Sequence, residues 1–89
     1  MIDIDHFKKI NDMYGHDIGD IVLKNFSKEV NYLIRVEDCF ARFGGEEFLL
    51  ILSNVDLKIA KEVIYRIMSK IREMEFNEVP NLKVTVSAG

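Results

Sequence analysis

The chain has 89 residues, of which 48% are apolar and 30% are charged, and its formal net charge is −3. This length suits one domain, the composition is typical of a globular protein, and the acidic balance argues against nucleic acid as the main partner. The single cysteine, Cys39, excludes a disulfide framework, and no apolar run approaches the length of a membrane span. We therefore expect a cytoplasmic domain with no membrane contact.

The first elements are a strand end and a short helix. Residues 1–5 alternate apolar and acidic side chains, which predicts the end of a strand that leaves the core. Asp5 is expected to cap a helix over residues 7–14, and Gly15 is expected to end that helix. Residues 16–20 are polar and are predicted to form a short connection.

The middle of the chain predicts a long helix and a hairpin. Apolar side chains at helical spacing predict an amphipathic helix over residues 18–34. Gly44 and Gly45 then separate two apolar segments, which predicts a tight hairpin of strands 39–43 and 47–53, because glycine adopts φ > 0 at little cost. The second of these strands is continuously apolar, so we expect it to be central and covered.

The last elements complete an α+β pattern. Apolar spacing of three and four predicts a helix over residues 56–74, and alternation predicts a half-covered strand over residues 82–88. The order β-α-α-β-β-α-β suits a two-layer sandwich with a mostly antiparallel sheet and helices on one face, of the ferredoxin-like or nucleotide-cyclase (palm-like) kind. In that topology the first strand lies beside the second hairpin strand, so Asp3 and Glu46 should be neighbours.

Four acidic residues are then expected to converge on one edge of the sheet: Asp3, Asp5, Glu46 and Glu47. Clustered carboxylates repel unless a cation lies among them, and oxygen donors favour Mg²⁺ or Mn²⁺ over zinc. The helix that begins after Asp5 carries Lys8, and a helix N-terminus favours phosphate. These features indicate chemistry on a nucleoside triphosphate. Spacing alone leaves open the alternative that the acids are merely exposed strand and turn residues.

Three motifs resemble those of a known family. Residues 3–12 (DIDHFKKIND), 14–20 (YGHDIGD) and 42–48 (RFGGEEF) closely resemble the GGDEF domain of bacterial diguanylate cyclases, in the same order and at matching separations. Residues 84–89 are similar to the strand that follows the long helix in that family. The resemblance implies condensation of two GTP molecules into cyclic di-GMP with release of pyrophosphate. It also implies a homodimer in which two such domains face each other, each with one GTP and two Mg²⁺ or Mn²⁺ ions.

The resemblance implies roles for the acidic residues. Asp3 and Glu46, with the backbone carbonyl of Ile4, would bind the metal ions. Glu47 would be a second catalytic acid, either as a metal ligand or in handling the 3′-hydroxyl. Lys8 would add positive charge beside the phosphates.

Further matching positions would bind the substrate. Backbone N–H groups around Phe7 and Lys8 would hold the β- and γ-phosphates, and Gly45 would allow the hairpin to approach the nucleotide. Asn11 and Asp20 would contact the guanine edge, where a carboxylate can accept from N1–H and the 2-amino group together. Taken singly, Asp20 could instead be an ordinary acid in the first turn of a helix, and Asn11 an exposed helix residue.

A second set of residues resembles the family's inhibitory product site. Arg35 and Asp38 have the Arg-x-x-Asp spacing, five residues before Gly44, and Arg66 matches a second arginine of that site. Guanidinium groups pair well with phosphates and stack on guanine. The alternatives are that Arg35 only interacts with a helix C-terminus and that Arg66 is an exposed helix charge.

The resemblance covers only part of the family's domain. Residues 1–89 are expected to be a partial GGDEF domain that lacks the family's N-terminal helix and its C-terminal helix and strand. We therefore expect these residues alone to be weakly active or inactive. Two other functions remain open: a degenerate GGDEF domain that acts only as a receptor for GTP or cyclic di-GMP, and a ferredoxin-like interaction module.

Overall fold

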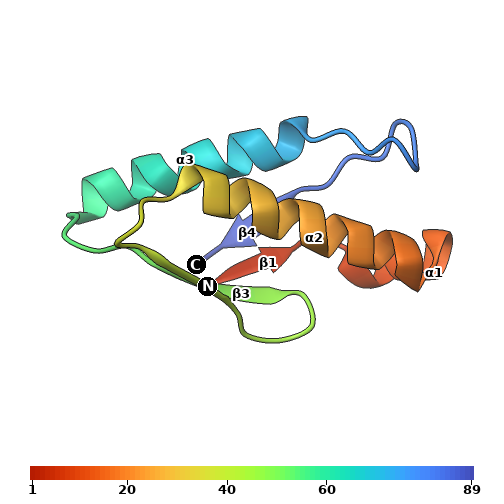
Figure 1. The fold of residues 1–89 in the computed structure, drawn as a ribbon, viewed down its shortest axis with the longest axis horizontal. Coiled ribbons are helices and arrows are strands. Elements are labelled where there is room, and N and C mark those ends of the chain that lie inside the picture. The colour runs from red at the N-terminus through yellow and green to blue at the C-terminus, as the bar shows by residue number, and fades with distance from the viewer.

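The structure is a computed structural model that describes residues 1–89 (Figure 1). Its elements follow the predicted order β-α-α-β-β-α-β. Their bounds are β1 Ile2–Ile4, α1 Phe7–Tyr14, α2 His16–Leu33, β2 Cys39–Arg42, β3 Glu47–Ile51, α3 Leu57–Glu73 and β4 Val86–Ala88. No helix combines the length and the apolar character needed to cross a membrane.

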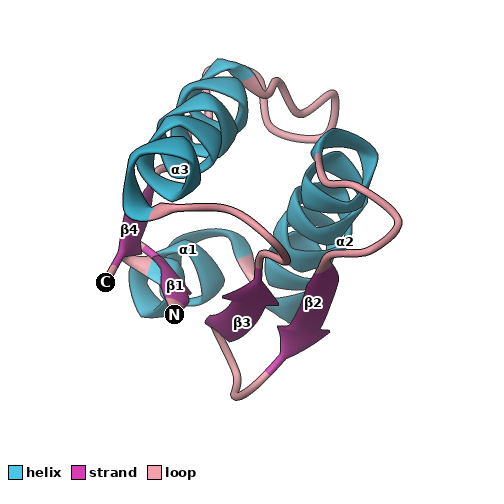
Figure 2. Ribbon diagram, turned by 90° about the vertical axis from the view of Figure 1, so that its left-hand side faces the viewer, coloured by secondary structure: helices cyan, strands magenta, loops and turns pink.

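The four strands form one antiparallel sheet in the order β2-β3-β1-β4. The predicted neighbour of the first strand is confirmed, because β1 pairs with β3, with Ile2 opposite Phe48 and Asp3 opposite Glu47. Helices α2 and α3 lie on the same side of the strands (Figure 2). The α+β fold class is therefore confirmed, and the sheet brings the start of the chain beside the hairpin.

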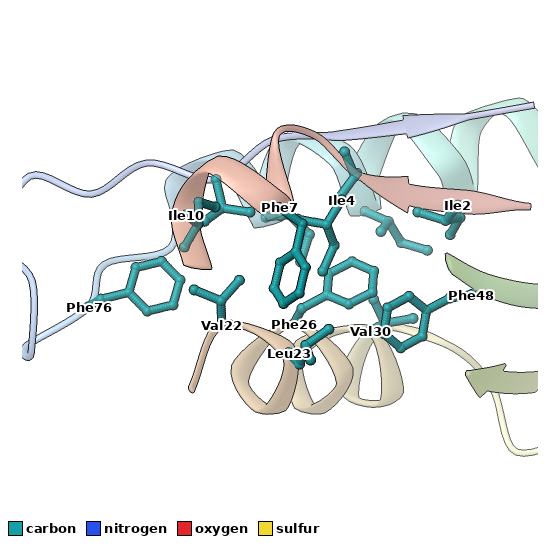
Figure 3. Close-up of a cluster of buried hydrophobic side chains, with 14 of the residues drawn as sticks. Ile2, Ile4, Phe7, Ile10, Val22, Leu23, Phe26, Val30, Phe48 and Phe76 are labelled. Carbon is teal, nitrogen blue, oxygen red and sulfur yellow. The ribbon is translucent and has the colours of Figure 1, made fainter. Parts of the chain in front are cut away.

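The core lies between the sheet and the two long helices (Figure 3). Three phenylalanines pack together in it: the ring of Phe26 on α2 packs edge-on against Phe48 at 4.8 Å and against the partly buried Phe40 at 5.8 Å, and Phe40 stacks on Phe48. Edge-to-face aromatic pairs at these distances add to the stabilisation from burial. Phe48 directly follows Glu47, so the core fixes the strand that carries the hairpin acids.

Strand β3 is central but is not covered on both faces. Leu49 and Ile51 are 36% and 51% exposed, whereas Phe48 between β2 and β1 is buried. The prediction of a fully covered strand was wrong, because a continuous apolar run does not show which face the helices cover. The side chains of Asp3 and Glu47, which are register partners, are exposed as well.

The predicted polar connection over residues 16–20 was also wrong. Helix α2 begins at His16, directly after Gly15, whose N–H donates to the carbonyl of Asn11 at 2.8 Å. Gly15 ends α1 as predicted, and its φ of 92° lets one residue turn the chain from α1 into α2. The corner between the two helices is therefore short, which holds Asn11 close to the first turns of α2.

The C-terminal elements agree with prediction except in the length of the strand. Asp56 caps α3, as its Oδ1 accepts from the N–H of Ile59 at 2.9 Å. The predicted strand over residues 82–88 forms a ladder only over Val86–Ala88, because β1 offers only three residues for pairing. Leu82 and Val84 are nevertheless buried, as the alternation predicted.

Candidate functional site

The hairpin turn is held by backbone and side-chain hydrogen bonds. The N–H groups of Phe43 and Gly44 both donate to the carbonyl of Glu47, at 2.8 and 3.1 Å. Arg42 donates from Nε to the carbonyl of Gly44 at 3.0 Å and from Nη2 to that of Gly45 at 2.6 Å. A four-residue loop, 43–46, separates the strands, so the glycines do not need φ > 0, and that expectation was wrong. Arg42 was not predicted as a site residue, although its position directly before the turn was a signal.

Acids from β1 and from the hairpin meet as the topology predicted. Asp3 is opposite Glu47 in the register, and the N–H of Ile4 donates to the carbonyl of Glu46 at 3.1 Å. One surface hollow, here called the acidic pocket, contains all of these residues. Its lining consists of Asp3, Ile4, Asp5, His6, Phe7, Lys8, Lys9, Glu46 and Glu47.

Asp5 behaves differently from the other acids. Its carboxylate accepts from the hydroxyls of Ser87 and Thr85, at 2.6 and 2.8 Å, and its N–H donates to the carbonyl of Thr85 at 2.9 Å. The hydrogen bond from Ser87 lowers the pKa of Asp5, against the effect of burial and with help from Thr85. The predicted capping role was wrong: His6, with φ 57°, precedes α1, and no side chain caps that helix. Asp5 instead ties the end of β1 to β4.

The remaining acids have unused oxygens. The carboxylates of Asp3, Glu46 and Glu47 take part in no hydrogen bond or ion pair, unlike that of Asp5. No three His, Cys, Asp or Glu side chains gather closely enough to hold a metal ion by themselves. A cation at this place would therefore need non-carboxylate oxygens as well, such as a backbone carbonyl.

A second hollow adjoins the acidic pocket and is here called the interhelix pocket. The two share Phe7, Lys8, Glu46 and Glu47. The other residues that line the interhelix pocket are Asn11, His16, Asp20, Leu23, Arg42 and Gly45. The structure thus brings Asn11 of α1 and Asp20 of α2 to one pocket beside the hairpin. Leu23 was missed because its apolar side chain marks only a core position in the sequence.

The Arg35–Asp38 pair lies apart from both pockets, after α2. Three nitrogens of Arg35, the backbone N, Nε and Nη2, donate to the carboxylate of Asp38, with Nη2 to Oδ1 at 3.0 Å. Nη2 also donates to the carbonyl of Ser53 at 2.5 Å. The Asp38 side chain is only 2% exposed and also accepts from the N–H of Ser53 at 3.1 Å. Hydrogen bonding from Arg35 lowers the pKa of Asp38 to about 2. Arg66 is exposed on α3 and forms no hydrogen bond or ion pair with Arg35 or Asp38.

This lowered pKa predicts an acid-sensitive loop. The folded-state value of about 2 lies below the ordinary value of 3.8, so the carboxylate stabilises the fold above about pH 4, and this contribution is lost as the pH falls towards 2. Asp38→Asn is therefore expected to lower the urea midpoint of unfolding at pH 7 and to have a much smaller effect at pH 2. Glu37→Gln, at the half-exposed partner of Arg35, is the matched control. An equal decrease of the urea midpoint of Asp38→Asn at pH 7 and at pH 2 would contradict this prediction.

Comparison with known proteins identifies the family. The model of the family described as diguanylate cyclase, GGDEF domain, matches residues 1–89. The chain belongs to the GGDEF domain family. This GGDEF domain is 43% identical over 90 residues to diguanylate cyclase A of Treponema denticola, with all of the chain matched. The chain spans about a quarter of that relative's length, 24%.

Solved structures of GGDEF domains have the same fold. The active GGEEF domain of a diguanylate cyclase from Vibrio cholerae is 36% identical, with a TM-score of 0.86 over 96% of this chain and 54% of that one. The GGDEF domain of DgcB from Caulobacter crescentus, solved in complex with c-di-GMP, is 28% identical, with a TM-score of 0.87 over 97% of this chain and 53% of that one. The predicted family is thus confirmed.

Proposed function

We propose that this GGDEF domain is part of a diguanylate cyclase that condenses two GTP molecules into cyclic di-GMP and releases pyrophosphate. The observation that supports this most directly is the junction of the two pockets. The acidic pocket provides unpaired carboxylates, the interhelix pocket provides Asn11 and Asp20, and Phe7, Lys8, Glu46 and Glu47 line both. Such an arrangement suits a nucleotide whose phosphates lie by the acids and whose base lies between the helices.

The donors in the acidic pocket fit a hard divalent cation. Asp3 and Glu46 offer free carboxylates, and the carbonyl of Ile4 offers a third oxygen beside them. This all-oxygen set favours Mg²⁺ or Mn²⁺, which retain water or phosphate oxygens in the remaining positions. When bound, two such ions would activate the 3′-hydroxyl of one GTP and stabilise the pyrophosphate leaving the other. Glu47 lines the same pocket, and it would act as a further ligand or handle the proton of the 3′-hydroxyl.

The start of α1 is suited to the phosphates. No side chain caps this helix, so the N–H groups of its first turn, around Phe7 and Lys8, are available to a ligand. Lys8 lines both pockets and adds a positive charge. These groups would neutralise the β- and γ-phosphates while the acids bind the cations.

The interhelix pocket is suited to guanine. The carboxylate of Asp20 can accept from N1–H and the 2-amino group together, a donor pair that adenine lacks. Asn11 offers an amide from the facing helix. One domain would bind one GTP in this way, and a second copy facing it would supply the other GTP, so that each 3′-hydroxyl attacks the α-phosphorus of the opposite nucleotide.

The test of this proposal is incubation of the full-length protein with GTP and Mg²⁺. Cyclic di-GMP and pyrophosphate are the expected products. Binding of GTP without turnover would instead support a nucleotide receptor, and no nucleotide binding would support an interaction module. The free carboxylates of Asp3 and Glu46 favour the enzyme over a receptor for cyclic di-GMP, because that nucleotide has no triphosphate for a cation to bind.

We also propose that cyclic di-GMP inhibits the enzyme at a site formed by Arg35, Asp38 and Arg66. The guanidinium groups are suited to phosphate and guanine, and both arginines are exposed. Arg35 already binds Asp38 and the carbonyl of Ser53, so the product would have to share its nitrogens with these acceptors. Arg66 has no such partner and is free for the product.

Arg66→Ala is therefore the cleaner test of product inhibition. Loss of a charge-assisted hydrogen bond of about 1.5–3 kcal/mol should raise the concentration of cyclic di-GMP for half-inhibition by roughly 10-fold or more. Initial turnover should stay unchanged, since Arg66 lines neither pocket. Arg35→Ala should also weaken inhibition, but it leaves Asp38 without its ion-pair partner.

The control for this experiment is Arg72→Ala, which removes another exposed arginine of α3. Half-inhibition should be unchanged in that variant. If Arg66→Ala and Arg72→Ala gave the same half-inhibition as the unmodified protein, the assignment of Arg66 would be wrong.

A further inference from the structure

Gly19 lies where α2 passes the side chain of Asn11. Gly19 is buried, and a Cβ built on it would clash with Oδ1 of Asn11 and lie 2.9 Å from Cγ of that residue. Real Cβ atoms do not approach other atoms so closely, so any side chain at position 19 would displace the Asn11 amide. The amide occupies the space that the missing side chain leaves.

The Asn11 amide is not held there by hydrogen bonds. Its Oδ1 is buried and has no hydrogen-bond partner. A buried acceptor without a partner is unfavourable for the fold, so stability alone does not explain why the amide is placed there. The main chain of the corner is satisfied, since the carbonyl of Asn11 accepts from Gly15 and that of Gly15 accepts from the N–H of Gly19 at 3.2 Å.

Backbone conformation does not require glycine at position 19 either. Gly15 is the only glycine with a positive φ, and Gly19 lies inside α2 with helical geometry. Glycine inside a helix is about 1 kcal/mol less favourable than alanine. A residue that served only the helix would therefore be better as alanine, and the open space beside Asn11 is the feature that glycine provides.

We propose that Gly19 is a specificity-determining positioning residue for the nucleotide base. Its bare Cα lets the Asn11 amide lie against α2, beside Asp20, which is the next residue of that helix. Both side chains then line the interhelix pocket, and because the Oδ1 of Asn11 is buried against α2, the amide nitrogen is the atom that it presents to the base. The inference rests on the proposed function, because it assumes that guanine binds in this pocket.

The test compares guanine with adenine nucleotides in the full-length protein. The probes are the α,β-methylene analogues of GTP and ATP, which cannot release pyrophosphate, and calorimetry gives the affinity for each. In Gly19→Ala, the preference for the guanine analogue is expected to fall about 10-fold, because a displaced amide loses its contact with the base. Lys28→Ala, an exposed change on α2 outside both pockets, should leave the preference unchanged.

A double variant separates positioning from damage to the fold. If Gly19 acts through Asn11, then Gly19→Ala combined with Asn11→Ala should have the same preference as Asn11→Ala alone and a urea midpoint at least as high, because alanine is the better helix residue. This comparison holds even if Gly19→Ala alone does not fold, because Asn11→Ala removes the atoms with which the new Cβ clashes. If the losses of guanine preference in the two single variants added up in the double variant, or if the double variant did not fold, the inference would be overturned.

Two other outcomes distinguish failure of the inference from failure of the proposed function. If Asn11→Ala lowers the guanine preference and Gly19→Ala does not, Gly19 has no positioning role, while the proposed function stands. If the unmodified protein binds both analogues equally, the interhelix pocket does not select guanine, and the proposed function fails together with the inference.

Discussion

Glu46→Gln is expected to reduce the formation of cyclic di-GMP by the full-length protein on the order of 10²–10³-fold. Glu46 lines both pockets, and its carboxylate has no protein partner, so its charge is available to a cation. Glutamine has the same size but no charge, and a neutral amide binds Mg²⁺ weakly. The loss should appear mainly in turnover, because the proposed base contacts at Asn11 and Asp20 are unchanged in this variant.

The measurement is the rate of product formation at saturating GTP and Mg²⁺, followed by chromatography. The matched control is Glu62→Gln, which changes an exposed acid of α3 outside both pockets and should keep the full rate. Affinity for the α,β-methylene analogue of GTP, measured without a divalent cation, should be no lower in Glu46→Gln than in Glu62→Gln, because the change removes a negative charge beside the phosphates. A Glu46→Gln enzyme with nearly full activity would show that this carboxylate does not bind the catalytic ions.

The arrangement of the acids could be predicted because topology determines it. Once β1 is placed between β3 and β4, Asp3 must lie near the hairpin, and the register that pairs it with Glu47 follows from alternation of buried and exposed residues. In β1 the sequence itself shows this alternation, with Asp3 exposed between buried Ile2 and Ile4, whereas the continuous apolar run of β3 does not show it. The helices α1 and α3 were predicted for the same reason, since their apolar spacing is regular.

The predictions that were wrong concern features that depend on contacts between segments distant in sequence. Aspartate before a helix is a common N-cap residue. In the structure, however, Thr85 and Ser87 lie against Asp5, and their hydroxyls, rather than the N–H groups of α1, donate to its carboxylate. Likewise, the exposure of Leu49 and Ile51 depends on which face the helices cover, which an apolar run does not specify. In both cases contacts between distant segments, rather than the local sequence, determine the structure.

Two site features could not be read from residue types at all. Arg42 folds back onto the carbonyls of Gly44 and Gly45, which depends on the shape of the loop. The close approach of Gly19 to Asn11 depends on how tightly α1 and α2 pack at Gly15. In the sequence, Arg42 and Gly19 belong to motifs, but only the packed structure shows what each one touches.

Phe26→Ala is expected to have the largest effect on stability, a loss of about 3–5 kcal/mol in the free energy of unfolding. The Phe26 side chain is fully buried and contacts the rings of both Phe40 and Phe48. Removing it deletes two aromatic contacts and leaves a cavity between α2 and the sheet. A loss of this size is a large fraction of the 5–15 kcal/mol that is typical of domain stability.

Urea unfolding compares this variant with Tyr32→Ala, which removes an aromatic ring from the same helix at a position that is 84% exposed. That control should change the free energy of unfolding by no more than about 0.5 kcal/mol. The cavity in Phe26→Ala would lie next to Phe48, which is opposite Ile2 and directly follows Glu47. This cavity should therefore also loosen the pairing of β1 with β3 that places Asp3 opposite Glu47. GTP turnover in the variant should therefore fall even under conditions where most molecules remain folded. Similar stability in Phe26→Ala and Tyr32→Ala would show that the phenylalanine cluster does not hold α2 to the sheet.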